Sequence, residues 1–299
     1  MMRIPLCLFT ALSLLAATNG FAHGPPLPAM IDAHAHYSAP DAAALSADAV
    51  LARLDAAGVR RMVVTSSPPD LAQALYRHAP ERFVPLLGVY TSDFQKANWV
   101  HDPGLPERVA AHLQHGSWAG IGELHLFAGD ARQPVFAALV RLAAARKLVL
   151  MIHGDTEVVD QAFAIAPEAR VLWAHLGTQP APAALDAMLA RFPQLWIDTS
   201  VRDERIAPEG TLLPEWRALF ERHPERFVVA VDTFSINRWR QYETVVAGIR
   251  NWVAPLPQPL KRQRPRSRAS LRPRPAASLL RGRYPIRRTL GRVQLQFPR

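Results

Sequence analysis

Short β-rich runs alternate with amphipathic stretches along most of this sequence, and this alternation constrains the fold more than any other feature. Most of the runs are continuously apolar, as expected for strands that are covered on both faces of a parallel sheet. The segments between them carry apolar residues at helical spacing. Eight runs fit buried strands, at residues 30–35, 61–66, 83–91, 120–126, 148–153, 171–175, 195–199 and 227–231.

Repeated strand–helix pairs of this kind occur in two α/β folds, the doubly wound open sheet and the closed (β/α)8 barrel. A TIM barrel has about 250 residues and eight strand–helix units. Residues 23–254 supply eight such units in a stretch of that size. The strand count therefore predicts a single (β/α)8 TIM barrel, with the open sheet as the alternative.

The amino-terminal segment has the pattern of an export signal. Arg3 precedes an apolar stretch over residues 4–17 and small residues at 20–22, which predicts a signal peptide over 1–22. An uncleaved anchor is the alternative. Cleavage would place the protein in the periplasm or outside the cell, without stable membrane insertion, and would remove Cys7, the only cysteine. A disulfide framework and a cysteine-based zinc site are therefore excluded.

The carboxy-terminal segment over residues 255–299 differs in composition from the rest of the chain. It holds 13 of the 35 Lys and Arg and 8 of the 27 Pro, without any Asp or Glu. Such a composition predicts a disordered tail. One interpretation is a basic arm for an anionic surface, although the tail has no interleaved aromatics that would stack on bases, so we expect no nucleic-acid partner. The interpretation that we favour is an out-of-frame reading of a GC-rich gene.

Histidines and acids stand at or near the carboxyl ends of five predicted strands. These strand ends meet on one face of a barrel, and residues two apart in a strand share a face. A lone histidine there is usually just hydrogen-bonded, but a buried acid needs a partner, and one or two divalent cations would serve the whole set. Nitrogen and oxygen donors suit several metals, with Zn²⁺ foremost. The predicted ligands are His34, His36, Glu123, His153, His175 and Asp232.

Three further residues are candidate substrate contacts. His125 shares a strand face with Glu123 and is its rival as a ligand, but we expect it to contact the substrate or to support the ligands. Arg202 follows the seventh strand and would pair with a substrate carboxylate through two hydrogen bonds. The alternative for Arg202 is a solvated arginine that pairs with a neighbouring acid. Tyr37 follows His36 and is expected to line the mouth of the barrel.

His-x-His on the first strand, histidines on the fifth and sixth and an aspartate on the eighth resemble the amidohydrolase superfamily over residues 30–254. The flanking sequence is similar to the amidohydrolase-related branch, which includes lactone hydrolases, nonoxidative decarboxylases and amidases. The resemblance implies that Asp232 is a metal ligand and proton shuttle. It also implies that His175 binds a second metal or polarises a carbonyl. No lysine stands at the strand-four position, where Glu123 would take over the bridging role of a carbamylated lysine.

The resemblance implies a metal-dependent hydrolase that attacks a C–N or C–O bond of a small carbonyl substrate, and the predicted signal peptide implies that this hydrolase is periplasmic. A bound Zn²⁺ lowers the pKa of its water from 15.7 to about 7, which provides hydroxide at neutral pH. One alternative is nonoxidative decarboxylation of a carboxylated aromatic at the same site. A catalytically inactive metal-binding protein is the other.

Overall fold

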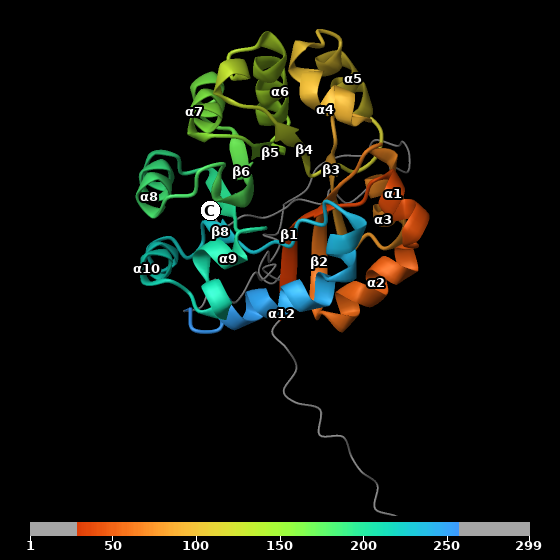
Figure 1. Cartoon of the computed structure of the whole chain (residues 1–299). Coiled ribbons are helices and arrows are strands. Elements are labelled where there is room, and N and C mark those ends of the chain that lie inside the picture. Colours follow the sequence, from red (N-terminus) through yellow and green to blue (C-terminus); the bar gives the residue numbers. More distant parts are fainter. Residues whose placement is uncertain (1–28, 257–299) are drawn as a thin grey trace, which may run out of the picture.

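The computed structural model describes residues 29–256 of the 299-residue chain. The predicted signal peptide, and the predicted tail beyond Leu256, lie outside the described residues. Eight strands and the helices between them alternate along the chain (Figure 1). The strands are β1 (Met30–His36), β2 (Val59–Thr65), β3 (Phe83–Leu87), β4 (Gly120–His125), β5 (Val149–His153), β6 (Arg170–Trp173), β7 (Leu195–Asp198) and β8 (Phe227–Val228).

Helices surround the strands, and short 3-10 turns join some of them. The α-helices are α1 (Ala39–Ala44), α2 (Ala47–Ala56), α3 (Asp70–His78), α4 (Asp93–Asn98), α5 (Leu105–His112), α6 (Pro134–Ala145), α7 (Thr156–Ile165), α8 (Pro182–Arg191), α9 (Asp203–Ile206), α10 (Pro214–Arg222), α11 (Ile236–Arg240) and α12 (Tyr242–Val253). The 3-10 turns are η1 (Trp99–His101), η2 (Ala128–Asp130), η3 (Ala174–Leu176) and η4 (Pro208–Gly210).

The strands form one parallel sheet in the order β1 to β8, and this sheet curls until its first and last strands meet. Just beyond β8, the Ala33 amide donates to the Val229 carbonyl (3.1 Å). Further along, the Asp232 amide donates to the His34 carbonyl (2.8 Å). These bonds join the eighth strand to β1, so the TIM barrel prediction is confirmed and the open sheet is excluded.

Three strands end two or more residues earlier than the sequence predicted. β3 stops at Leu87, and it is followed by Gly88, where a side chain would lie 2.4 Å from the Ser66 carbonyl oxygen. β6 stops at Trp173, because the next turn places His175 at a φ of 62°. β8 pairs with β7 only through Phe227–Val228, and the following residues bond to β1 instead.

The interior of the barrel is apolar at one end and polar at the other. An apolar cluster fills the end of the interior where the strands begin. Further along the same strand faces, toward the carboxyl ends, the inward side chains become polar. On β5 the cluster residue Met151 is followed by His153, and on β7 Trp196 is followed by Asp198. The cluster consists of Val63, Val84, Leu86, Ala119, Val149, Met151, Leu172 and Trp196.

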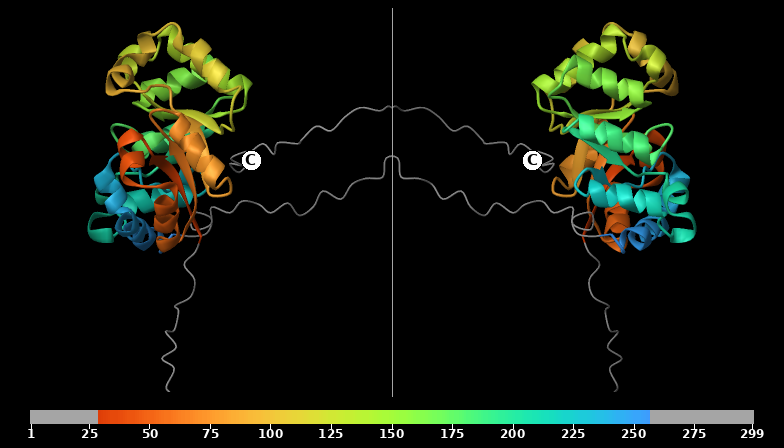
Figure 2. Two further views of the ribbon diagram at one scale, coloured as in Figure 1. Left: turned by 90° about the vertical axis from the view of Figure 1, so that its right-hand side faces the viewer. Right: turned by 90° about the vertical axis from the view of Figure 1, so that its left-hand side faces the viewer.

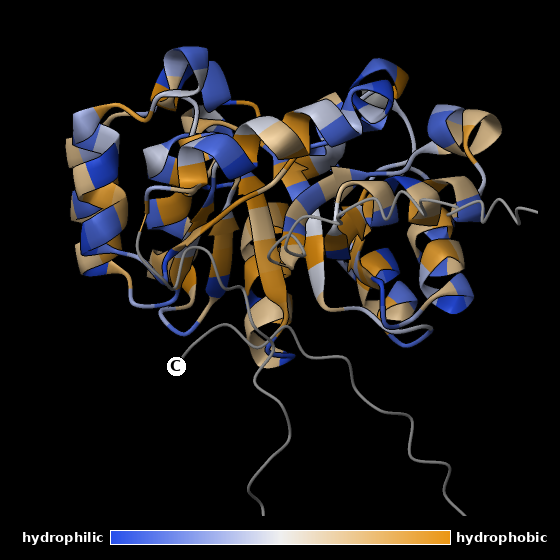
Figure 3. Cartoon of the chain, turned by 90° about the horizontal axis from the view of Figure 1, so that it is seen from below, coloured by the Kyte–Doolittle hydropathy of each residue, from blue (hydrophilic) through white to orange (hydrophobic). Residues whose placement is uncertain are grey.

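A larger core lies between the strands and the surrounding helices. The helices turn apolar faces inward and hydrophilic faces outward, while the strands between them are mostly hydrophobic (Figure 3). In α6, for example, Phe136, Leu139, Val140 and Ala143 are buried, which is the spacing of one helical face. Helix burial therefore holds the strands together and leaves their carboxyl ends open for a site.

The last helix closes the ring against the first part of the chain. α12 contacts α2, and the two lie side by side in both side views (Figure 2). Arg250 of α12 donates to the carbonyls of Ala57 and Gly58 after α2 (3.1 and 3.0 Å). Leu256, which the sequence assigned to the tail, is fully buried. Among residues 29–256, the helices are too short or too polar to cross a membrane.

Candidate metal centre

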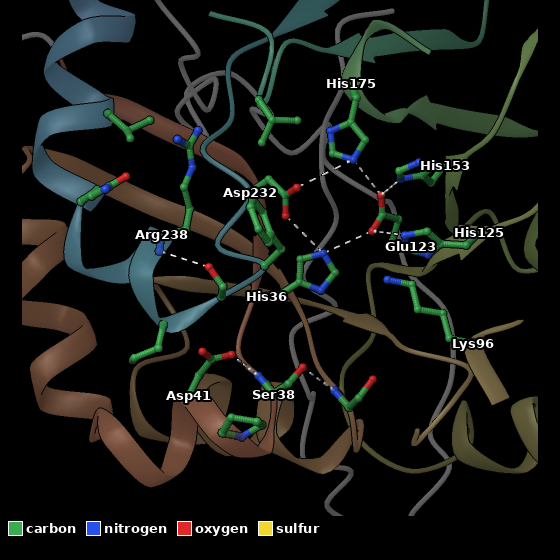
Figure 4. A pocket seen from close by; sticks show the side chains of 18 of the residues that line it. His36, Ser38, Asp41, Lys96, Glu123, His125, His153, His175, Asp232 and Arg238 are labelled. Atoms are coloured by element: carbon green, nitrogen blue, oxygen red, sulfur yellow. Dashed lines mark hydrogen bonds and ion pairs between the residues drawn. The ribbon is translucent and has the colours of Figure 1, made fainter. Parts of the chain in front are cut away.

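The carboxyl ends of the strands bring all six predicted ligands together, with His125 beside them. Figure 4 shows His125 and the ligands that line the cavity. Glu123 of β4 lies at the centre of the group and is almost completely buried. His34 is completely buried beneath the floor of the cavity, while the other five ligands and His125 line it. The barrel thus converts residues about 200 positions apart into one compact cluster of donors.

The two histidines of β1 lie on one side of Glu123. The Nε2 atoms of His34 and His36 are 3.2 Å apart. His36 Nε2 lies 3.2 Å from Glu123 Oε2 and 3.4 Å from Asp232 Oδ1. His34 Nε2 lies 3.6 and 3.8 Å from the same two oxygens. All four donor atoms therefore face one small volume.

The remaining histidines lie around the other side of Glu123. His153 Nδ1 and His175 Nε2 each lie 3.0 Å from Glu123 Oε1. His125 Nε2 lies 3.3 Å from Glu123 Oε2, and its ring stacks on that of His153. Glu123 therefore contacts imidazoles from β1, from β5 and from the turn after β6, and it lies between them.

Three groups of donor atoms are close enough to hold a cation, with all atoms of a group within 4.8 Å of one another. The groups are His34, His175 and Asp232; His34, His36 and Glu123; and Glu123, His125 and His153. His153 thus falls in a group with His125 rather than with the two histidines of β1. His125 was expected from the sequence to contact the substrate or to support the ligands. In the structure it is one of the three candidate ligands of the third group.

The backbone around the centre adopts unusual conformations. His175, Leu176 and Asp232 have positive φ angles of 62°, 57° and 56°. Such conformations cost residues other than glycine on the order of 1 kcal/mol or more, and they concentrate at functional sites. Gly122 has a φ of 135°, and a side chain there would lie 2.5 Å from the Met151 carbonyl oxygen. Only glycine therefore fits before Glu123.

Asp198 at the end of β7 and Ser200 just after it orient the histidines, and neither was predicted from the sequence. The buried Asp198 accepts a hydrogen bond from His34 Nδ1 (3.0 Å) through Oδ2. Its Oδ1 accepts from the amides of His175 and Ser200, both at 3.0 Å, and from the Ser200 hydroxyl. Ser200 Oγ in turn accepts from His175 Nδ1 (2.8 Å). Asp198 occupies the same strand face as Trp196, and this alternation is the one sequence signal that could have identified it.

The charge of Asp198 fixes the direction of these bonds. Burial raises the pKa of the Asp198 carboxyl, but the His34 imidazole and the hydrogen bonds outweigh this effect and hold the pKa at about 2. The ionised carboxylate can only accept, so His34 Nδ1 carries a proton. The Ser200 hydroxyl donates to Asp198, so His175 Nδ1 also carries a proton. When either ring is neutral, its Nε2 lone pair therefore points into the cluster.

A second missed carboxylate, Asp32, joins β1 to the last part of the barrel. It accepts hydrogen bonds from the Val231 amide (3.0 Å), the His34 amide (3.2 Å) and the Tyr242 hydroxyl (3.0 Å). Burial raises the pKa of Asp32 to about 7 despite these donors. Asp32 therefore supports the backbone on both sides of the centre without facing the cavity.

The donor set fits a cation. Two carboxylates and the imidazole lone pairs point at one another, an arrangement that repels unless a positive charge lies between them. Asp232 Oδ1 is buried and accepts no hydrogen bond from any residue between 29 and 256. Burial lowers the pKa of His34, but Glu123, Asp232 and Asp198 together raise it well above its usual range. These carboxylates thus attract positive charge into the cluster.

The centre forms the floor of an open cavity of about 1760 Å³. Arg202 lines this cavity, with Nε bonded to the His175 carbonyl (2.9 Å) and Nη2 to the Gly177 carbonyl (3.2 Å). The structure places Tyr37 behind the cavity wall, with its ring buried and its hydroxyl bonded to the Leu45 carbonyl (2.5 Å). This position gives no support to the expected contact between Tyr37 and a substrate.

An eight-stranded barrel with imidazoles and carboxylates gathered at its carboxyl end defines the class of metal-dependent barrel enzymes. A model of the amidohydrolase family matches residues 31–263. The chain belongs to the amidohydrolase family, whose enzymes are of the metal-dependent hydrolase type. Comparison with curated proteins gave no significant match.

Several solved structures are similar in fold. An amidohydrolase from Burkholderia multivorans with bound HEPES has a TM-score of 0.50 and 15% sequence identity, over 78% of this chain and 94% of that one. A second crystal form of that amidohydrolase, with bound zinc, has the same identity and coverage and a TM-score of 0.49. Amidohydrolase 2 from Bifidobacterium longum subsp. infantis is 22% identical over 75% of this chain and 94% of its own, with a TM-score of 0.44. At such identities the likeness concerns the fold alone.

Proposed function

We propose that this protein is a periplasmic hydrolase that cleaves a C–N or C–O bond of a small carbonyl substrate with the help of one or two divalent cations, foremost Zn²⁺. The observation that carries the proposal is the convergence of donor atoms on Glu123 and on Asp232 Oδ1, which accepts no hydrogen bond within the described residues. A bound divalent cation supplies Lewis-acid chemistry, because it polarises a carbonyl oxygen and lowers the pKa of water.

The proposal assigns the cation to the donors of β1 and of the strands opposite. His34 would hold a cation together with His36 and Glu123 or with His175 and Asp232, and His153 would hold one together with Glu123 and His125. Asp198 and Ser200 keep His34 and His175 in the tautomer with a free Nε2, as supporting carboxylates and hydroxyls do in metal sites. The all-nitrogen-and-oxygen set is typical of catalytic Zn²⁺ but also suits Mn²⁺ or Co²⁺.

Asp232 has the position of a general acid and base. Its Oδ1 is free of hydrogen bonds within the described part of the chain, and the side chain lines the cavity floor. A carboxylate in that place can accept a proton from the attacking water at Oδ1 and return it to the leaving group. His175 lies on the same floor, with Nε2 3.8 Å from Asp232 Oδ2, where it can bind the cation or polarise the carbonyl oxygen.

The experiment combines metal analysis with a substrate screen. Purified protein should contain one or two equivalents of a divalent metal and hydrolyse at least one member of a panel of lactones, amides and esters. Asp232→Asn should lower kcat by about 100-fold or more, since general acid–base groups contribute 10²–10⁴-fold. Asp186→Asn is the matched control, because Asp186 bonds to His223 on the outer helices.

Three outcomes would overturn this proposal. Protein without stoichiometric metal after refolding in Zn²⁺ would exclude a metal centre. Full metal occupancy with release of CO₂ from carboxylated aromatics, and with no hydrolysis, would assign the decarboxylase alternative instead. Metal occupancy without either activity would assign the inactive metal-binding alternative.

A further inference from the structure

Lys96 extends from α4 into the cavity, with its amine directed toward the side of Glu123, His36 and His125 (Figure 4). The side chain is partly buried. Within residues 29–256 its ammonium group forms no hydrogen bond and no ion pair. A lysine whose charge faces a metal-binding cluster, without a counter-ion of its own, calls for a ligand that supplies one.

The other two cations of the cavity wall already have partners. Arg202 donates to the carbonyls of His175 and Gly177. Arg238 donates to the Val231 carbonyl from Nε (3.1 Å) and from Nη2 (3.0 Å). These bonds fix both guanidinium groups as parts of the wall. Of the cavity cations in the described part of the chain, Lys96 is thus the one with all its donors available to a ligand.

Electrostatics select an anionic ligand at this position. A divalent cation held by Glu123 would share the cavity with the Lys96 ammonium, and two positive groups on one side of a partly desolvated site repel each other. An anion that lies between them removes this repulsion and gains a charge-assisted hydrogen bond. One ammonium group matches the single negative charge of a carboxylate.

The rest of the cavity suits an apolar body. Phe234, which is 62% exposed, lines the cavity just after the eighth strand, and Ile236 of α11 and Val245 of α12 line it as well. An exposed aromatic beside a polar centre is a common feature of ligand pockets. The cavity thus offers a charged contact from α4 and an apolar surface from the last part of the barrel.

We propose that Lys96 binds a carboxylate of the substrate, so that the substrate is a carbonyl compound that carries a carboxylate group besides the carbonyl that reacts. This inference rests on the proposed function for the position of the reacting carbonyl. It assigns to Lys96 the carboxylate recognition that the sequence analysis assigned to Arg202. Lys96 is then a specificity-determining residue rather than part of the proton-transfer machinery.

The test measures binding rather than turnover, so its failure is distinguishable from failure of the hydrolase proposal. Calorimetric titration of the Zn²⁺-loaded full chain compares dicarboxylates from malonate to adipate with monocarboxylates of the same length. The wild type should bind its best dicarboxylate at least tenfold more tightly than the matched monocarboxylate, because the second carboxylate reaches Lys96. Lys96→Met should abolish this preference, and Lys96→Arg should keep part of it.

Lys147→Met is the matched control, since Lys147 is exposed just before β5, at the opposite end of the barrel. It should bind every ligand as the wild type does. Lack of a dicarboxylate preference in the wild type would overturn the proposal, and so would a preference that survives in Lys96→Met. Circular dichroism and metal content identify a misfolded Lys96→Met, in which case Lys96→Gln decides by the same criterion.

Discussion

Replacing Asp198 by asparagine tests how the seventh strand controls the metal centre. Three donors converge on Oδ1 of Asp198, namely the amides of His175 and Ser200 and the Ser200 hydroxyl. In Asp198→Asn the amide side chain has a single oxygen, and these three donors keep it at the Oδ1 position. The amide nitrogen therefore replaces Oδ2 and faces His34 Nδ1, 3.0 Å away in the wild type.

A nitrogen donor opposite Nδ1 reverses the tautomer of His34. Nδ1 then has to accept, so the ring proton moves to Nε2, the atom that faces His36 and Asp232. A protonated Nε2 cannot bind a cation. Loss of a supporting carboxylate costs metal sites about 10–100-fold in affinity, which corresponds to about 1.4–2.8 kcal/mol. We expect a loss at the upper end, because this substitution removes the charge and also reverses the tautomer.

The assay is competition for Zn²⁺ between the protein and a chromophoric chelator, with circular dichroism to verify the fold. Asp186→Asn should retain wild-type affinity, since Asp186 belongs to α8 and bonds to Arg222 at the end of α10 and to His223 just after it. An affinity within twofold of wild type in a folded Asp198→Asn would refute the tautomer argument.

Three further perturbations have definite expected outcomes. Removing the metal with a chelator should lower the Tm, and restoring it at 100 times its Kd should stabilise the fold by about 2.7 kcal/mol, or about 5–11 °C by calorimetry. Gly122→Ala should destabilise the protein by about 2 kcal/mol or more in denaturant titrations, because the new methyl group would lie 2.5 Å from the Met151 carbonyl oxygen at a φ of 135°; an unchanged midpoint would contradict this. Tyr242→Phe removes a donor from the buried Asp32 and should cost about 1–3 kcal/mol in the same titration, whereas a neutral result would show that another group replaces the hydroxyl.

The sequence contained enough information for the barrel and for the convergence of the predicted ligands. Strand periodicity and strand ends are local properties, and a parallel barrel brings all carboxyl ends to one face. Placing His34, His36 and Asp232 at strand ends was therefore sufficient to bring them together. The sequence pattern did not predict which ligands share a cation. That depends on side-chain geometry, which places His153 with His125 and separates it from the β1 histidines on the other side of Glu123.

The supporting residues could not be predicted, because their partners are distant in sequence. Asp198 meets His34 across 164 positions, and Asp32 meets Tyr242 across 210. Each looks like an ordinary strand residue until the barrel closes. The short β8 also reflects a contact that is distant in sequence. The Val231 amide, which the predicted strand would have used for pairing with a neighbouring strand, donates to the Asp32 carboxylate instead.

The meeting of β1 with the eighth strand has a consequence for biosynthesis. A ribosome releases His34 and His36 early, but their barrel neighbours Val229 and Asp232 emerge only after nearly 200 more residues. Until then one edge of β1 has no hydrogen-bonded neighbour, and such an edge can pair with a strand of another chain and cause aggregation. Pairing of the eighth strand with β1 therefore completes the candidate metal centre and covers the edge of the first strand in the same late event.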